Sequence, residues 1–240
     1  MLTASKLYLM CVATIPPGGH PVPAYLIQTE EGTNVLVDTG VPKAMIGAYG
    51  SSPEAVFAME PEHYVVRQLA RIGVAPKDID YVVCTHYDLD HVGNLEDFPD
   101  AEVVVQRAHH EAAQTLPRFE RTREHWNLPA QRRRLVEGDA ELLPGIELIE
   151  SGGHVPGHQA VLVRLPATGP VLLAIDAIPH SRLMDPDGRW MEPYDMDEAG
   201  VRASTRKLVD LARREGVALL VCGHDPGQWA GFRLLPDYYA

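Results

Sequence analysis

The sequence is poor in cysteine and in positive charge. Three cysteines, Cys11, Cys84 and Cys222, are widely spaced within apolar segments, and this odd number suggests no disulfide framework. We therefore expect a reducing location, the cytoplasm. The 21 lysine and arginine residues oppose 33 aspartate and glutamate residues, which gives a net charge of −12. This balance argues against nucleic acid as a substrate, because a phosphate backbone requires a basic surface to replace its counterions.

Long apolar runs and linkers are missing as well. No run reaches the roughly 18 apolar residues of a membrane span, so we expect no membrane insertion. The apolar residues 7–15 follow Lys6 as in a signal peptide, but this short run enters Pro16-Pro17-Gly18-Gly19, which favours a first β-strand. No Pro-, Gly- or Ser-rich linker divides the chain, so residues 1–240 are predicted to form a single domain. The Gly-x-Ser-x-Gly motif of serine hydrolases is also absent.

One short segment, in contrast, is dense in groups that can bind a metal ion: His86, Asp88, Asp90 and His91. The apolar residues 81–84 before it indicate a buried strand, so the cluster is expected on a loop at a strand end. In an extended loop alternate side chains point to one side, whereas the neighbours Asp90 and His91 are expected to diverge. The segment is therefore predicted to serve two adjacent ions. Gly93 is expected to allow a tight turn where a helix begins.

Three further segments place a histidine or an aspartate at the end of an apolar run: Gly152 to His158, Leu172 to Asp176, and Val221 to Asp225. A lone histidine or aspartate on a loop is more often a solvated or capping residue. A fourfold repetition of the same arrangement is hard to obtain by chance. The pattern therefore predicts a metal centre that strand ends assemble from distant parts of the chain.

In the remaining sequence, segments with the apolar pattern of β-strands alternate with segments that have the pattern of α-helices. Strands are predicted over residues 7–15, 24–29, 35–37, 79–84, 103–105, 146–149, 161–165, 171–175 and 218–221, helices over 62–73, 109–116 and 201–211, and a turn over 138–145. Residues 42–59 are interpreted as a mobile loop over the site. A basic region comprises Arg118, Arg121, Arg123, Arg132, Arg133 and Arg134. Interleaved glutamates favour salt-bridged helix surfaces there, with a rim that attracts an anionic substrate as the alternative.

These segments resemble the metallo-β-lactamase superfamily. Within it the N-acyl-homoserine lactonases are most similar, on Val35-Leu36-Val37-Asp38-Thr39-Gly40, Gly153-His154-Val155-Pro156-Gly157-His158-Gln159 and Ala174-Ile175-Asp176-Ala177. The resemblance implies an α/β fold, a four-layer αβ/βα sandwich in which helices cover two facing sheets. It also implies a hydrolase that opens a lactone ring, with N-acyl-homoserine lactone as the expected substrate. The alternatives are a hydrolase of β-lactams, thioesters or phosphotriesters, or an inert metal-binding protein.

The same resemblance implies the roles of the candidate ligands. His86, Asp88 and His154 would hold one divalent ion, Asp90, His91 and His224 would hold another, and Asp176 would bridge the two ions. Zinc is the expected metal, with manganese or iron as alternatives. Water between two such ions is acidic enough to provide a nucleophile, and Asp90 would orient it and pass a proton to the leaving oxygen. We expect the protein to bind a small-molecule substrate and neither nucleic acid nor a membrane. A homodimer is a further expectation.

Two positions depart from the lactonase pattern. Asp88 stands where most of the family has a histidine, so three carboxylates and a hydroxide would face two divalent ions. This added negative charge favours harder ions such as Mn²⁺ or Fe²⁺, unless Asp88 does not bind. The second departure is Pro179, which stands three residues after Asp176 where many lactonases carry a tyrosine. His180 and Tyr194 are the candidates to replace that tyrosine.

Five other polar side chains near these segments are expected not to bind metal. His158 is assigned to packing or to support of a ligand, and Cys222 to a buried thiol. Asp38 follows a strand and is expected to accept hydrogen bonds from turn amides, with support of a metal ligand as the alternative. His109 and His110, which no Pro-Gly turn or paired carboxylate accompanies, are assigned to the surface or to packing.

Overall fold

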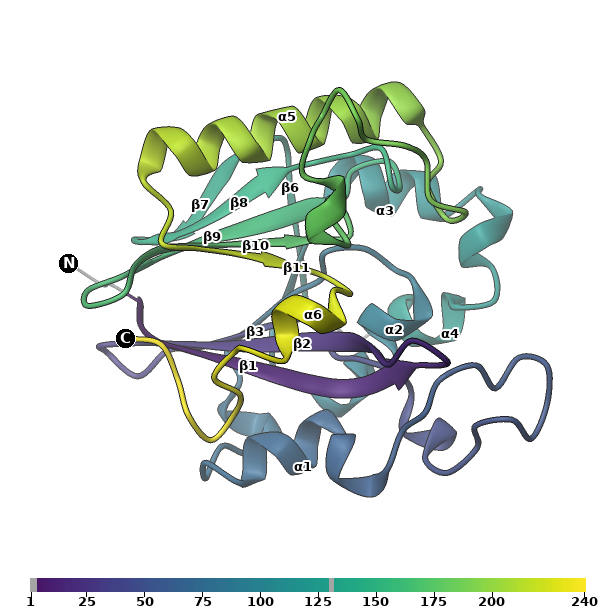
Figure 1. Ribbon diagram of the computed structural model, residues 1–240. Helices are drawn as coiled ribbons and strands as arrows, with labels where there is room; N and C mark the ends of the chain where they lie inside the picture. Colours follow the sequence, from purple (N-terminus) through teal and green to yellow (C-terminus); the bar gives the residue numbers. More distant parts are fainter. Residues whose placement is uncertain (1–3, 130–131) are drawn as a thin grey trace.

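The computed structural model describes residues 4–129 and 132–240, which form two β-sheets packed face to face with helices outside (Figure 1). The first sheet has the order β1-β2-β3-β4-β5-β6 and consists of β1 (Ala4–Ile15), β2 (His20–Thr29), β3 (Asn34–Val37), β4 (Tyr81–Val83), β5 (Glu102–Gln106) and β6 (Arg133–Val136). The second has the order β11-β10-β9-β8-β7 and consists of β7 (Ala140–Leu143), β8 (Ile146–Glu150), β9 (Gln159–Leu165), β10 (Gly169–Ile175) and β11 (Leu219–Cys222).

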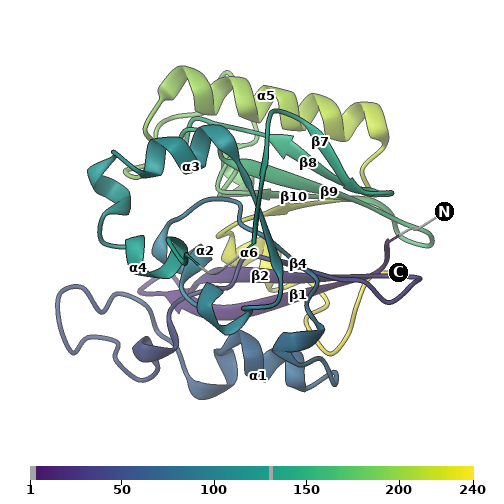
Figure 2. The same cartoon turned by 180° about the vertical axis from the view of Figure 1, so that it is seen from behind.

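Helices lie on the outer faces of the sheets and beside the edges between them (Figure 1). They are α1 (Val65–Ala70), α2 (Leu89–Val92), α3 (Arg107–Ala113), α4 (Arg123–Trp126), α5 (Glu198–Glu215) and α6 (Pro226–Trp229). The long α5 lies over the second sheet and α1 lies under the first, which gives the predicted four-layer αβ/βα sandwich (Figure 1). Seen from behind, α3 and α4 lie on the same side of the molecule as α2 (Figure 2). No helix of the described residues has the length and apolar character needed to cross a membrane.

The alternating pattern of the strands explains why the sheets face each other. In β1, Leu7 and Leu9 point into the core between the sheets, whereas Tyr8 and Met10 belong to a second core under the helices. Leu173 of β10 enters the core between the sheets from the other side. Because such a sheet is buried on both faces, its strands read as continuous apolar runs.

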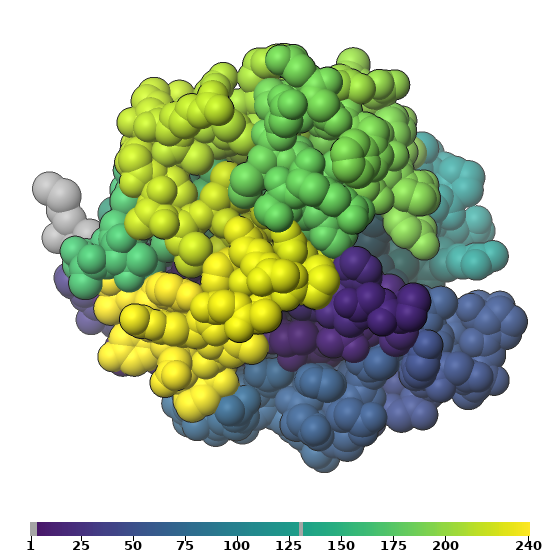
Figure 3. Space-filling model, viewed as in Figure 1, coloured from purple at the N-terminus to yellow at the C-terminus, as the bar shows by residue number. Residues whose placement is uncertain are grey.

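The end of the chain closes an edge of the first sheet. The amide of Leu7 donates to Tyr239, and the amide of Leu235 donates to Leu9. Figure 3 shows this C-terminal segment in yellow against the purple N-terminal strands. An edge strand with free amides invites pairing with another chain, so the segment protects β1. The single-domain organisation stays a prediction.

Several predicted elements differ in the structure. The helix near Gly93 precedes this glycine, because α2 already ends at Val92. Gly93 has an ordinary φ of −62°, and a Cβ there would lie 2.4 Å from the backbone nitrogen of Pro42. Close approach of two chain segments, and not a tight turn, therefore requires glycine at this position.

The basic region and its neighbours were also assigned incorrectly in part. Arg133 and Arg134 lie in β6 and not on a helix, and Arg134 pairs with Glu102 of the adjacent strand. The predicted turn over residues 138–145 contains β7. The predicted helix over 62–73 is regular only over α1, after a short 3₁₀ helix at Pro61–His63. In β6 two arginines are followed by Leu135 and Val136, and a run this short does not distinguish a strand from a helix.

Candidate metal centre

The predicted metal-binding segment lies directly after β4, as expected, but its last two members behave differently from the prediction. Asp90 and His91 lie in α2, and Asp90 Oδ2 is 3.7 Å from His91 Nε2. The two side chains therefore converge instead of diverging. The short helical turn changes the direction of the chain after Asp88, so the geometry of an extended loop no longer applies there.

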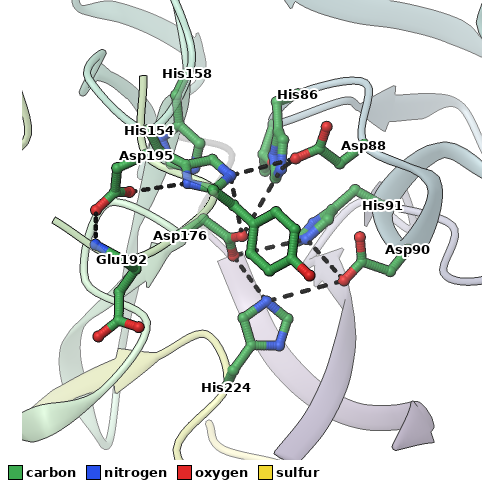
Figure 4. Close-up of polar contacts among 12 residues, drawn as sticks. His86, Asp88, Asp90, His91, His154, His158, Asp176, Glu192, Asp195 and His224 are labelled. Atoms are coloured by element: carbon green, nitrogen blue, oxygen red, sulfur yellow. Dashed lines mark hydrogen bonds and ion pairs between the residues drawn. The ribbon is translucent and has the colours of Figure 1, made fainter. Parts of the chain in front are cut away.

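The seven candidate ligands come together in one cluster (Figure 4). Potential ligand atoms lie within 4.8 Å of one another in three sets. We call His86, Asp88 and His154 the first group, and Asp90, His91 and His224 the second group. The remaining set joins His86 and His91 to Asp176.

Asp176 lies between the two groups. Its Oδ2 is 3.4 Å from Nε2 of His154 in the first group. Its Oδ1 is 3.1 Å from Nε2 of His224 and 3.6 Å from Nε2 of His91, both in the second group. One carboxylate thus presents one oxygen to each group, which is the arrangement that a bridging ligand requires.

Buried polar atoms in this centre indicate what it can bind. Nε2 of His86, Nε2 of His91 and Oδ1 of Asp176 are buried and make no hydrogen bond with the described residues. Buried polar atoms are almost always paired, so a group of unpaired ones requires an explanation. Imidazole nitrogens and carboxylate oxygens are suitable ligands for zinc, manganese and iron. The residues present therefore fit a binuclear metal centre.

The hydrogen bonds of the histidines leave their Nε2 atoms directed at the centre. His86 Nδ1 contacts Thr85 Oγ1 at 3.0 Å, and this hydroxyl donates to Asp38. Nδ1 of His91 contacts Asp38 Oδ2 at 2.8 Å, and Nδ1 of His224 contacts the carbonyl of Pro21 at 2.7 Å. Carboxylates and carbonyls only accept, so these Nδ1 atoms donate and the Nε2 lone pairs remain for an ion.

His154 is oriented in the same way by a residue that the sequence did not reveal. Its Nδ1 lies 3.1 Å from Asp195 Oδ1 (Figure 4). The other oxygen of Asp195 accepts from Arg189 at 2.8 Å and from the amide of Glu192 at 2.8 Å. Asp195 follows no apolar run and is 41 residues from His154 in the sequence. No local signal distinguishes it from the other acidic residues of that loop.

The backbone around His154 depends on two glycines. Gly153 has a φ of +127°, and a Cβ there would lie 2.2 Å from the amide nitrogen of Val201 in α5. Gly157 has a φ of +64°, and a Cβ there would lie 2.4 Å from the amide nitrogen of His109 in α3. Both positions combine a left-handed backbone with close approach of another chain segment, so only glycine fits.

The charges of the centre favour cations. Burial opposes protonation, but Asp90, Asp176 and Asp38 raise the pKa of His91 to about 10. Burial also opposes protonation of His154, yet its hydrogen bonds to Asp195 and Asp88 raise its pKa to about 9. The raised pKa values of these two histidines reflect an excess of negative charge in the centre, which a metal ion can neutralise. An ion that binds Nε2 of either ring must displace such a proton.

Arg118 is a second residue whose role the sequence did not reveal. Nε donates to Asp88 Oδ1 at 2.8 Å, and Nη2 donates to Asp88 Oδ2. Of the two interpretations of the basic region, this arginine matches neither a salt bridge along a helix nor an exposed rim. Its contact with a candidate ligand spans 30 residues of sequence.

Of the three predicted catalytic residues, only Asp90 belongs to the centre. His180 precedes a short 3₁₀ helix, Ser181–Leu183, and its ring packs against that of His20 at 5.1 Å between centroids. The side chain of Tyr194 is 72% exposed, and its carbonyl accepts from Arg118. Neither residue is a member of the three metal-binding sets. Their replacement of the lactonase tyrosine stays a prediction.

The residues that were expected not to bind metal lie outside those sets. His158 Nδ1 contacts Ser151 Oγ at 2.9 Å, and burial lowers the pKa of its ring to about 3. Burial raises the pKa of the Cys222 thiol to about 12, and this side chain belongs to the core under α5. Asp38, with a φ of 60°, supports His91 as described above. His109 is buried and holds the amide of Tyr87.

Residues 17–224 match the family model described as the Metallo-beta-lactamase superfamily. The chain belongs to this superfamily. An N-acyl homoserine lactonase of a Bacillus species is 32% identical over an alignment of 257 positions, which covers 99% of this chain and 100% of that protein. The lactonase AttM of Azorhizobium caulinodans is 35% identical over an alignment of 237 positions, which covers 91% of this chain and 87% of that protein.

A solved structure extends the likeness from sequence to shape. An N-acyl homoserine lactone hydrolase with the product N-hexanoyl-L-homoserine at its catalytic metal centre superimposes with a TM-score of 0.87 at 29% identity. The superposition covers 99% of this chain and 100% of that one. The predicted fold, the resemblance to lactonases and the assignment as a metal-dependent hydrolase are confirmed.

Proposed function

We propose that this protein opens the lactone ring of N-acyl-homoserine lactones at a centre of two divalent metal ions. The observation that carries the proposal is the position of Asp176 between two groups of ligand atoms, with Nε2 of His86 and of His91 unpaired beside it. The likeness to lactonases over nearly the whole chain supports the choice of substrate class.

Hydrolysis of such a ring requires a few well-placed groups. When bound, two divalent ions supply an acidic water and a positive charge beside the substrate carbonyl. The first group would hold one ion, the second group would hold the other, and Asp176 would contact both. Water adds to the carbonyl carbon, the ester C–O bond breaks, and the ring oxygen leaves as the hydroxyl of an N-acyl-homoserine.

Asp90 is the group on which the proton transfers depend. Its Oδ2 lies 3.7 Å from His91 Nε2 and 4.0 Å from His224 Nε2, at the centre of the second group. A carboxylate there can accept a proton from the attacking water and donate it to the leaving oxygen. No covalent intermediate with the protein is needed.

Exposed apolar side chains near the centre suit an acylated substrate. Trp190, Met191, Tyr194 and Met196 are all exposed. They lie on the segment that carries Asp195, the partner of His154. An N-acyl-homoserine lactone is uncharged, so the net charge of −12 does not repel it. We infer that its acyl chain lies on this segment.

We propose zinc as the metal, with manganese and iron as the alternatives that Asp88 favours. Four imidazole nitrogens suit zinc, and the additional carboxylate suits harder ions. Elemental analysis of protein purified without added metal identifies the ion. Two ions per chain are expected after saturation, and a maximum of one would contradict the binuclear centre.

A substrate panel tests the proposed reaction. Protein loaded with Zn²⁺ or Mn²⁺ is offered N-acyl-homoserine lactones of several chain lengths, a simple γ-lactone, a β-lactam, a thioester and a phosphotriester. We expect the acylated homoserine lactones to be hydrolysed most efficiently. Efficient hydrolysis of another class in their place would replace the proposed substrate. Full loading with two ions and no turnover of any compound would indicate an inert metal-binding protein.

A further inference from the structure

The guanidinium of Arg118 reaches the first group from a short 3₁₀ helix, Pro117–Phe119, on the α3 side of the molecule. It makes four polar contacts. Nε donates to Asp88 Oδ1 at 2.8 Å and Nη2 donates to Asp88 Oδ2. Nη2 also lies 3.2 Å from His154 Nε2, and Nη1 donates to the carbonyl of Tyr194. The side chains of Arg118 and Asp88 are only 21% and 19% exposed, so water screens this pair weakly.

These contacts use the ligand atoms that the first group offers to an ion. Oδ2 of Asp88 lies 3.2 Å from Nε2 of His86 and 3.3 Å from Nε2 of His154, so it is the oxygen directed into the group. A ring nitrogen has a single lone pair, and an ion that binds Nε2 of His154 excludes a hydrogen bond there. A metal ion and the guanidinium therefore compete for the same space.

We propose that Arg118 is a built-in competitor for metal in the first group, so that the two ions bind in a fixed order with the second group filled first. Bidentate pairs between arginine and carboxylate are among the strongest charged hydrogen bonds, and an ion that takes the Nε2 lone pair of His154 must displace the Nη2 end of this one. Arg118 also carries the positive charge that balances Asp88. The first group is thus neutralised without an ion.

Among the described residues, no arginine or lysine takes an equivalent position in the second group. The carboxylates beside this group are Asp38, which accepts a hydrogen bond from His91, and Asp176, whose Oδ1 lies 3.1 Å from Nε2 of His224. No lysine or arginine of the described residues makes an ion pair with Asp90. An ion that binds this group displaces a proton from a histidine ring, as it does in the first group, but no guanidinium.

A metal titration tests this order. Metal-free protein is titrated with Co²⁺ in competition with a chelator, and the absorption of bound cobalt reports each step. For the wild type we expect two steps separated by at least about tenfold in affinity, the range over which groups behind the ligands change metal binding. Asp90→Asn should weaken the tighter step, and Asp88→Asn should weaken the looser step.

The decisive variant is Arg118→Met, which keeps much of the length of the side chain and removes its charge and donors. It should tighten the looser step by about 10- to 100-fold and leave the tighter step unchanged. Arg118→Lys keeps the charge without the bidentate contact and should give a smaller gain. Arg107→Met is the matched control, because Arg107 pairs with exposed Glu137 and should change neither step.

Opposite outcomes would overturn the proposal. A looser step that is unchanged or weaker in Arg118→Met would show that the arginine does not compete or that it organises the group for metal. If that variant does not fold, the wild-type titration decides alone, and two ions that bind with equal affinity contradict a fixed order. All readouts concern metal binding, so the result is independent of which lactone, if any, the protein hydrolyses.

Discussion

The two groups of the metal centre have similar ligands but different surroundings. Each contains histidine and one aspartate of the segment after β4, and each faces one oxygen of Asp176. The first group is in contact with Arg118 and depends on Asp195, which lies on a loop. The second is supported by Asp38, which is fully buried at the end of β3. Similar ligand chemistry can therefore give two positions of unequal strength.

Removal of metal should have the largest effect and should separate the two groups. A ligand at about 1,000 times its dissociation constant stabilises the folded state by about 4 kcal/mol, which corresponds to roughly 10 °C in melting temperature for a protein of this size. Increasing chelator should lower the melting temperature in two stages, with the ion of the first group lost first. Calorimetry at a series of buffered Zn²⁺ concentrations measures both stages, and a single stage would remove the difference between the groups.

Substitution of Asp90 should have the next largest effect. Asp90→Asn keeps the size of the side chain, so we expect the fold to persist, while hydrolysis per bound ion falls by about 100-fold or more. Asp88→Asn is the matched variant in the first group and should cost about tenfold or less per bound ion. Steady-state rates with parallel metal analysis give both values. Equal losses would mean that proton transfer is not the particular task of Asp90.

The residues behind the histidines allow a third comparison. Asp195→Asn should weaken metal binding in the first group by about 10- to 100-fold and leave the second group unchanged, because only His154 loses its acceptor. Asp38→Asn should weaken the second group most, because Asp38 contacts His91 directly. It should weaken the first group less, because Asp38 reaches His86 only through Thr85. Titration of both variants with Co²⁺ checks this. If either substitution weakened both steps alike, the two groups would be one cooperative unit.

Exchange of Asp88 for histidine should have the smallest effect. Asp88→His removes one negative charge and the partner of Arg118, and imidazole suits zinc better than manganese. We expect the ratio of zinc to manganese affinity to rise several-fold, measured by competition between the two ions. An unchanged ratio would show that Asp88 is not a ligand.

The sequence was sufficient to find the seven candidate ligands because each follows or begins near the end of an apolar strand. That signal is local, because the apolar run 81–84 directly precedes the segment of His86, and the apolar run 171–175 directly precedes Asp176. The layers of the fold followed from the same runs. The opposite directions expected for Asp90 and His91 were wrong because they assumed extended chain where α2 forms a helical turn.

What the sequence could not reveal depends on contacts between distant residues. Asp195 contacts His154 although 41 residues of sequence separate them, and Arg118 contacts Asp88 across a separation of 30 residues. Neither position has a pattern of its own, since acidic and basic residues on loops are mostly solvated. The need for glycine at position 93 likewise arises from Pro42, which is brought there only by the folded chain.

The two glycines beside His154 have a genetic consequence. Gly153 lies against the start of α5 and Gly157 against the start of α3, so a side chain at either position would push the loop out of place. A random screen for inactive mutants should therefore recover substitutions at Gly153 and Gly157 about as readily as substitutions at the metal ligands. Substitution by alanine, the mildest change available, already meets the backbone of a helix at both positions. Surveys of natural variants that inspect only histidines and aspartates would miss such inactive alleles.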